Sequence, residues 1–114
     1  MLTRKFSATS AIVARTAVKF TTNATVEPAT SATDRIIGIY MGVADAVTSD
    51  EVEILMFGPS LAVAGGSVGR GARLTVDANS KLVHAVSGDA IIAMAMASAS
   101  LDDLFEVIVI PSQF

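Results

Sequence analysis

Hydrophobic and polar residues alternate along much of this chain with a period of two. Between residues 12 and 20, Ile12 and Phe20 lie at even positions, whereas Arg15 and Lys19 lie at odd positions. Successive side chains of a β-strand point to opposite faces, so this pattern is typical of a strand with one buried and one charged face. We therefore predict a strand over residues 12–20.

The same pattern recurs between clusters of turn-forming residues. Further strands are predicted over 35–44, 51–57, 60–64, 72–76, 81–86, 90–97 and 105–110. We expect Gly58-Pro59 and Pro111 to end strands and residues 21–34, rich in Thr, Ser, Asn and Pro, to form a loop. Residues 90–104 also contain good helix formers, although we favour strand-loop-strand. Short strands at a spacing of roughly 8–12 residues predict an all-β fold, either a small β-barrel or a β-sandwich.

The chain contains an internal repeat. Segment 34–54 aligns without a gap on segment 89–109, at an offset of 55 residues, and the identical pairs are Asp34/Asp89, Ile36/Ile91, Ile37/Ile92, Met41/Met96, Ala44/Ala99, Glu51/Glu106 and Val52/Val107. A long period with only two copies is not a solenoid, which needs at least three units. The alignment favours two related halves closing one barrel or sandwich, and chance similarity between Ile- and Ala-rich strands is the alternative.

The repeat also defines the expected domain organisation. A chain of 114 residues is the size of one compact domain. We expect an N-terminal arm over 1–10 and a single β domain over 11–114, with repeat halves at about 19–57 and 73–110. Two pairs of acids receive structural roles. Asp34 and Asp89 are expected to cap turns, and Glu51 and Glu106 are each expected to begin the following strand.

The composition points to an assembly. Hydrophobic residues make up 52% of the chain and the mean hydropathy is +0.60, while aromatic residues make up only 5%. A small domain has too much surface to hide so many apolar residues alone. We therefore expect other chains to cover part of its surface. The alternative is that Ala-rich sequences are scored as hydrophobic without being adhesive.

Charge is unevenly distributed. Four basic residues against one acidic residue give residues 1–33 a net charge of +3, and the other 81 residues carry −6. An acidic body without clustered Lys and Arg argues against nucleic acid as a partner. The basic N-terminal segment either docks on an acidic protein surface or is an ordinary solvated edge. The longest run without a polar residue, 90–97, is too short to span a membrane, so no membrane partner is expected.

Candidate chemistry is sparse. The chain has no cysteine and a single histidine, His84, which has no ligand-spaced partners and is assigned a structural or surface role. The glycine-rich segment 65–71 lacks the Lys of a P-loop and precedes a predicted strand, which favours a flexible connection over a phosphate site. We therefore predict no catalytic residue, no metal site and no cofactor, and a protein that is not an enzyme.

Residues 58–110 contain a series of motifs in a defined order. A glycine-rich loop (65–71) precedes a strand and the turn Asp77-Ala78-Asn79-Ser80-Lys81. Then come Gly88-Asp89-Ala90-Ile91-Ile92-Ala93-Met94-Ala95 and a closing strand at 106–110. These motifs resemble those of phage capsid cement proteins, also called head decoration proteins, in which residues 88–95 are similar to the pattern Gly-Asp-x-(Ile/Val)-Ile-Gly-x-Ala. Ala93 departs from the glycine that is frequent in the family, and the N-terminal third matches poorly.

This resemblance implies a structural virion protein on the capsid exterior, assembled in the host cytoplasm. Its partners would be the major capsid protein, whose neighbouring copies it would clamp, and itself as a homo-oligomer, with a trimer favoured and a dimer as the alternative. Within this hypothesis we expect Arg4, Lys5 and Phe6 to contact the capsid or a neighbouring chain. The competing interpretation is a β-sandwich binding module for a carbohydrate or receptor, on a tail or cell surface, although few aromatic residues are available for a sugar platform.

Overall fold

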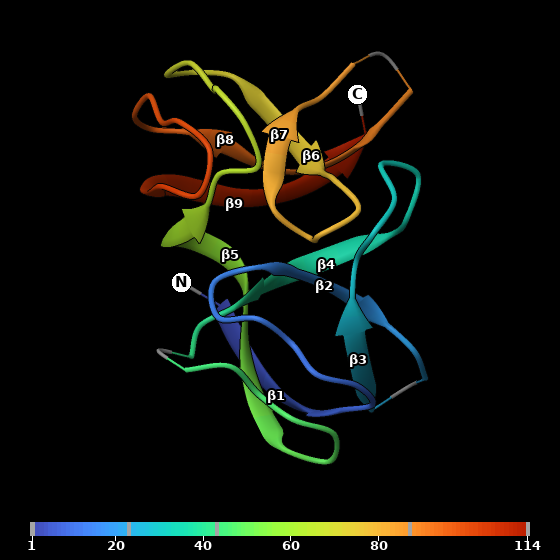
Figure 1. The fold of residues 1–114 in the computed structure, drawn as a ribbon. Coiled ribbons are helices and arrows are strands. Elements are labelled where there is room, and N and C mark those ends of the chain that lie inside the picture. The colour runs from blue at the N-terminus through green and yellow to red at the C-terminus, as the bar shows by residue number, and fades with distance from the viewer. Residues whose placement is uncertain (1, 23, 43, 87, 114) are drawn as a thin grey trace.

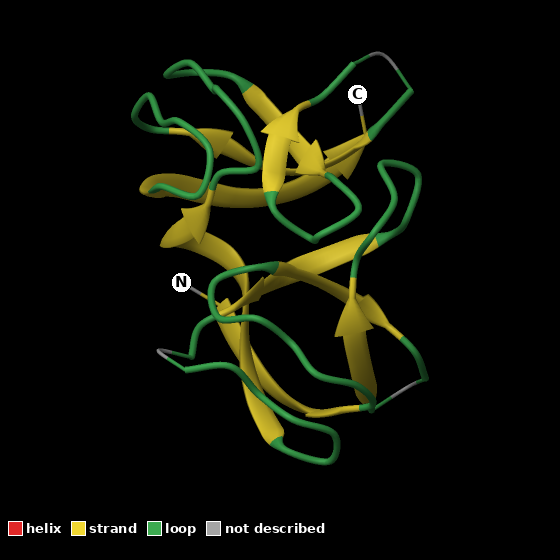
Figure 2. Ribbon diagram, in the orientation of Figure 1, coloured by secondary structure: helices red, strands yellow, loops and turns green. Residues whose placement is uncertain are grey.

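The described part of the protein is built of β-strands. The computed structural model describes residues 2–22, 24–42, 44–86 and 88–113, which form nine strands and no helix (Figures 1 and 2). The strands are β1 (Leu2–Ala8), β2 (Ala17–Phe20), β3 (Thr25–Pro28), β4 (Ile36–Tyr40), β5 (Glu51–Val63), β6 (Arg73–Val76), β7 (Leu82–His84), β8 (Ala90–Ala95) and β9 (Leu104–Gln113). The predicted all-β fold class is confirmed.

Five of the strands close into a barrel. The order is β1-β3-β2-β4-β5, and β5 pairs with β1 to complete the ring. The barrel is mixed, because β1 and β3 run parallel while the other neighbours are antiparallel. We call residues 2–57 the first lobe.

The remaining four strands extend from the second part of β5. Their order is β5-β9-β8-β6-β7, and a parallel bridge between Ala64 and Leu82 brings β7 back to the end of β5. We call residues 58–113 the second lobe. Figure 1 shows the two lobes one above the other, with the single long strand β5 running through both.

The two lobes repeat one arrangement of hydrogen bonds. Ile12 and Ala46 exchange two backbone hydrogen bonds in the first lobe, and Val68 and Ala99 do the same in the second. Each lobe also has a backbone bond that links the end of its fourth strand to its last strand: the N–H of Met41 donates to the carbonyl of Glu53, and the N–H of Met96 to that of Glu106. Equivalent positions in the two lobes therefore differ by 56 residues in the part before β4 and β8, as for Ile12 and Val68. They differ by 55 in β4 and β8 and by 53 in the last strand of each lobe.

This correspondence corrects part of the predicted alignment. The offset of 55 holds for β4 and β8, where Ile36 and Ile91 are equivalent. It fails beyond them, because the connection 41–50 is two residues longer than its counterpart 96–103. Glu106 is consequently equivalent to Glu53, and Glu51, which begins β5, is equivalent to Leu104, which begins β9.

Several predicted element boundaries are also corrected. Only Ala17–Phe20 of the predicted strand 12–20 is extended as a strand, because a turn with Arg15 at φ 63° precedes it. The predicted loop 21–34 contains β3. Strand β5 continues through Gly58-Pro59, where the edge facing β9 requires no N–H from Pro59, and β9 continues through Pro111.

A shared apolar core and backbone hydrogen bonds join the lobes. One buried cluster includes Val18 and Val26 of the first lobe, whereas a second cluster extends from Leu55 of the first lobe to Leu74 of the second. The Ala17 N–H donates to the Ser80 carbonyl at 3.1 Å, and the Ala90 N–H donates to the Ala32 carbonyl at 2.7 Å. The described residues include no helix with the length and apolar character that crossing a membrane requires.

Candidate functional site

The predicted contact residues all lie on β1, whose residues pair along β5. Arg4 and Lys5 are exposed, and the Nζ atom of Lys5 lies 3.5 Å from Oε1 of Glu51 in a solvated ion pair. Phe6 is only 8% exposed and packs edge-on against Phe20, with ring centroids 5.3 Å apart. The segment predicted as an arm is therefore a barrel strand over residues 2–8, and Met1 lies outside the described residues.

The residues considered for chemistry are not brought together. His84 is exposed on β7, and segment 65–71 connects β5 to β6. In the described ranges, no three His, Asp or Glu side chains are close enough to hold a metal ion. These positions therefore offer no constellation of side chains for acid–base or metal chemistry.

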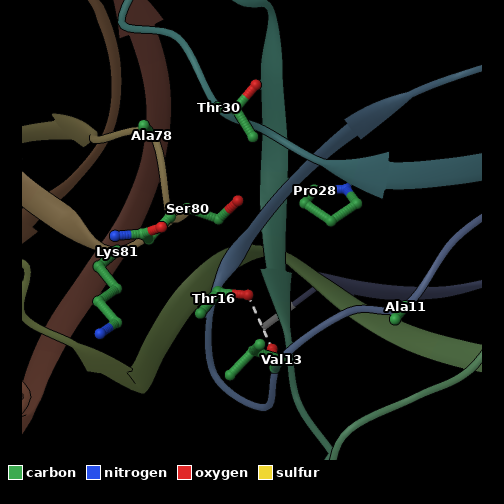
Figure 3. Close-up of a pocket in the computed structure, with 9 residues that line it drawn as sticks. Ala11, Val13, Thr16, Pro28, Thr30, Ala78, Ser80 and Lys81 are labelled. Carbon is green, nitrogen blue, oxygen red and sulfur yellow. Dashed lines mark hydrogen bonds between the residues drawn. The ribbon is translucent and has the colours of Figure 1, made fainter.

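An open hollow of about 490 Å³ lies where the two lobes meet (Figure 3). Val13 and Thr16 line it from the first lobe, and Ser80 and Lys81 line it from the second. The Thr16 hydroxyl donates to the Val13 carbonyl at 2.7 Å. A hydrogen bond to Asp102 raises the pKa of Lys81. The side chains of Thr16 and Lys81 are thus already engaged within the protein, and we interpret the hollow as a junction surface between the lobes.

Aspartate-capped turns recur at equivalent places, as predicted for Asp34 and Asp89. An Oδ2 atom of Asp34 accepts the Ser31 N–H at 3.1 Å, and an Oδ2 atom of Asp89 accepts the Val86 N–H at 2.8 Å. Burial opposes ionisation of Asp34, but hydrogen bonds from the backbone of Thr30 and from Lys19 outweigh it and lower the pKa of this carboxyl group. These acids hold turns together.

The most distinctive surface is an apolar strip on the outside of the second lobe, which includes the adjoining Phe57 of the first lobe and which we call the apolar face. The outward positions of β5 and β9 alternate with buried ones, and the register places Pro59 opposite Ile108 and Leu61 opposite Glu106. Leu61 and Leu104 are 44% and 59% exposed. The apolar face consists of Phe57, Pro59, Leu61, Met96, Leu104 and Ile108.

Two of these positions carry charged residues in the first lobe. Leu61 is equivalent to Lys5, and Leu104 is equivalent to Glu51, the two residues that form the exposed ion pair. Charged side chains are what a sheet face in water normally carries. The apolar face was not predicted from the sequence, because the break expected at Gly58-Pro59 divided β5 into two strands. The signal was present in the alternation Phe57, Pro59, Leu61.

The fold defines a class: an all-β protein in which a closed five-stranded barrel and four further strands share one long strand. No protein-family model and no curated protein sequence matches this chain. Its fold is similar to that in "The crystal structure of head fiber gp8.5 N base in bacteriophage phi29", with a TM-score of 0.71. The match covers 99% of this chain and 97% of that chain at 16% sequence identity.

This likeness shows a shared fold. The matched structure is the base of a head fiber, and membership of the cement family, which residues 58–110 resemble, is not shown by it.

Proposed function

We propose that this protein is a non-enzymatic structural component of a phage head, located on the capsid exterior. The observation that carries the proposal is the fold match to the N base of a phage head fiber, which extends over nearly the whole of both chains. A fold alone does not fix a function. Here, however, two further observations agree with it: the chemistry-bearing side chains lie apart, and an apolar face remains uncovered.

The finer role that we propose is capsid decoration, in which the protein clamps neighbouring major capsid proteins. Two related lobes joined by one strand offer two surfaces at a fixed separation. Repeated engagement of modest contacts raises the avidity for a lattice. Copies of the chain would also associate with one another, as expected from the excess of apolar residues.

Within this proposal, Arg4 and Lys5 are the contact residues and Phe6 holds the strand that carries them. Both basic side chains are exposed on β1, whereas the Phe6 ring lies in the core of the first lobe. Lys5 is in a solvated pair with Glu51, an arrangement of little intrinsic stability that a partner can displace.

Co-sedimentation with empty capsids from the same source tests the proposal. The wild-type protein should pellet with capsids and reach saturation at a fixed ratio. The double variant Arg4→Glu/Lys5→Glu should pellet at least tenfold less well, because rim charges steer association and suppress unfavourable contacts. Removing residues 1–8 altogether would be uninformative, since it deletes a strand of the barrel.

The matched control is Arg70→Glu, which reverses an exposed cation in a loop of the second lobe. It should pellet like the wild type. A wild-type protein that does not bind capsids would reject the head-decoration role and favour the alternative, a binding module for a carbohydrate or receptor, which a glycan array then examines.

A further inference from the structure

The hollow between the lobes lies at a point where the two lobes close differently. In the first lobe, the Ser7 N–H donates to the Ala24 carbonyl and joins β1 to β3. The equivalent groups of the second lobe are the Val63 N–H and the Ser80 carbonyl, and each of them bonds instead to segment 15–17 of the first lobe. The strands of the second lobe therefore part at this point, and the hollow lies beside the segment that fills the gap.

Ser80 gives the hollow a hydroxyl group that the protein itself does not use. The residue is only 3% exposed, and the turn that holds it at φ 64° is fixed by bonds from the Asn79 and Lys81 N–H groups to Oδ1 of Asp77. Figure 3 shows the Ser80 side chain pointing into the hollow. Within the described ranges, its hydroxyl group has no hydrogen-bond partner. A hydroxyl group donates one hydrogen bond and accepts two, so a ligand in the hollow can use it in both ways.

The rest of the lining combines neutral polar groups with small apolar side chains. Thr30 and Asn79 are exposed, and their side chains form no hydrogen bond with other described residues. The apolar part of the lining consists of Ala11, Val13, Pro28 and Ala78. A mostly apolar lining with a few placed polar groups is typical of small-molecule sites, and about 490 Å³ lies within their usual size range.

The lining favours an uncharged ligand. Among the described residues that line the hollow, only Lys81 carries a charge, and its Nζ atom is already bonded to Oδ1 of Asp102. A charged group that entered the hollow would lose water without gaining an opposite charge, which is unfavourable.

The main-chain groups beside the hollow argue against a peptide as the ligand. A peptide that adds to a sheet needs unpaired N–H and C=O groups along an edge. Here the Ala17 N–H donates to the Ser80 carbonyl at 3.1 Å, and the Val63 N–H donates to the Arg15 carbonyl at 3.2 Å. Recognition in the hollow therefore depends on side-chain hydroxyl and amide groups, which suit a ligand that is itself rich in hydroxyl groups.

We propose that the hollow binds a neutral N-acetylated sugar. The acetamido group supplies a methyl group for the apolar part of the lining. Its amide N–H and C=O match the Ser80 hydroxyl group, which both accepts and donates. The sugar hydroxyl groups would then bond to Thr30 and Asn79. This inference goes beyond the head-decoration role and does not depend on it.

Each site should bind one sugar weakly. The described lining contains no aromatic side chain on which a sugar ring could pack. For a ligand of this size, a dissociation constant of about 1 mM is expected. Many copies displayed together would raise the avidity for a surface that is covered with such sugars.

Nuclear magnetic resonance titration of the full chain with the methyl glycoside of N-acetylglucosamine tests the inference. The backbone amide signals of Thr16, Ser80 and Lys81 should shift and saturate with a dissociation constant of about 1 mM. Methyl glucoside, which has a hydroxyl group in place of the acetamido group, should bind about tenfold more weakly or less.

Three variants localise the binding. Ser80→Ala removes the hydroxyl group, places the residue of the equivalent position, Ala24, in the second lobe, and should raise the dissociation constant about fivefold. Ala78→Leu adds bulk at an exposed position of the lining and should abolish detectable binding. The matched control Ser67→Ala removes an exposed hydroxyl group from the loop 65–71 and should bind like the wild type. Thermal unfolding of each variant excludes misfolding as the cause of weaker binding.

Three results would overturn the inference. They are unchanged amide signals at a sugar concentration about 20-fold above the expected dissociation constant, equal affinity for methyl glucoside, and equal affinity of Ser80→Ala and the wild type. N-acetylalanine methylamide is the peptide probe, and binding as tight as that of the sugar would assign the hollow to a peptide and reject the sugar. None of these results bears on co-sedimentation with capsids, which tests the head-decoration role separately.

Discussion

The two lobes share a strand arrangement, but different residues fill equivalent positions in their cores. Phe6 faces Val52 across β1 and β5, whereas at the equivalent positions Ala62 faces Phe105 across β5 and β9. The large and small partners have exchanged strands, and all four residues are buried. Each lobe thus fills a similar volume, which is what a close-packed core requires.

The lobes differ more in their polar groups. Lys19 of the first lobe forms ion pairs with Glu27 and Asp34, at 3.8 and 3.2 Å. Thr75 occupies the equivalent position of the second lobe, and its buried hydroxyl has no hydrogen-bond partner among the described residues. The two lobes therefore have similar core volumes. The charge and the exposure of equivalent positions differ, because the surroundings of the two lobes differ.

The largest effect is expected from breaking the exchanged pair. Phe6→Ala should destabilise the protein by about 4 kcal/mol, because it removes a buried ring and leaves a cavity. The double variant Phe6→Ala/Val52→Phe copies the arrangement of the second lobe. It should be about 2 kcal/mol more stable than Phe6→Ala alone, as measured by urea unfolding. Equal stability of the two variants would show that the lobes do not follow the same packing rule.

Gly38 and its equivalent Ala93 give the next comparison. A Cβ atom at Gly38 would lie 2.2 Å from the Leu55 carbonyl oxygen, whereas Ala93 is accommodated in the second core. Gly38→Ala should therefore cost about 3 kcal/mol through overpacking. Ala93→Gly should cost only about 1 kcal/mol through backbone entropy. Chemical denaturation of both variants tests this ranking, and a reversed order would contradict the equivalence.

Asp34 and Asp89 cap equivalent turns, but among the residues that the structure describes only Asp34 forms an ion pair with a lysine. Asp34→Asn should destabilise the protein by about 1–2 kcal/mol at pH 7. The folded pKa of Asp34 is lowered from 3.8, so its contribution is complete above that value and is lost as the pH falls through the lower, folded pKa.

The difference between the wild type and Asp34→Asn should consequently shrink during acid titration of thermal stability. Asp89→Asn serves as the matched control and should have a smaller effect at pH 7, because Thr75 stands where the first lobe has Lys19. If the stability difference between the wild type and Asp34→Asn stays constant down to low pH, ionisation of the Asp34 carboxyl group does not cause it.

The smallest effect is expected at Thr75. Thr75→Val replaces an unpartnered buried hydroxyl with a methyl group of similar shape and should stabilise the protein by about 1 kcal/mol. Thr16→Val is the control, since the Thr16 hydroxyl donates to the Val13 carbonyl and its loss should destabilise by about the same amount. In thermal unfolding, Thr75→Val should have a higher melting temperature than the wild type, and Thr16→Val should have a lower one.

Much of the fold could be predicted from the sequence, because period-two alternation survives wherever one face of a strand is buried. The strand around Val107 alternates in this way, whereas the strand around Ile36 was predicted from its run of β-branched residues and is buried on both faces. Strand β3 was missed because its residues, Thr25–Pro28, have the composition of a loop, and only pairing with β2 and β1 makes them extended. Local signals do not contain such long-range pairings.

The candidate surface was harder to predict than the fold. The offset of 55 hid the equivalence of Leu104 with Glu51, since the connection 41–50 is two residues longer than its counterpart 96–103 and changes the offset in the last strand of each lobe by two residues. Phe6 was grouped with Arg4 and Lys5 from its place in the sequence. Its burial is a property of the closed barrel, which brings Phe20 against it.

Strand β5 has a mechanical consequence. An extended strand already rises about 3.3 Å per residue, close to the longest span that a polypeptide allows. Strand β5 is the covalent connection between the lobes, and it can therefore lengthen very little. A load that separates the lobes would be transmitted directly along the backbone of Glu51–Val63 and would be resisted by the hydrogen bonds on both of its edges.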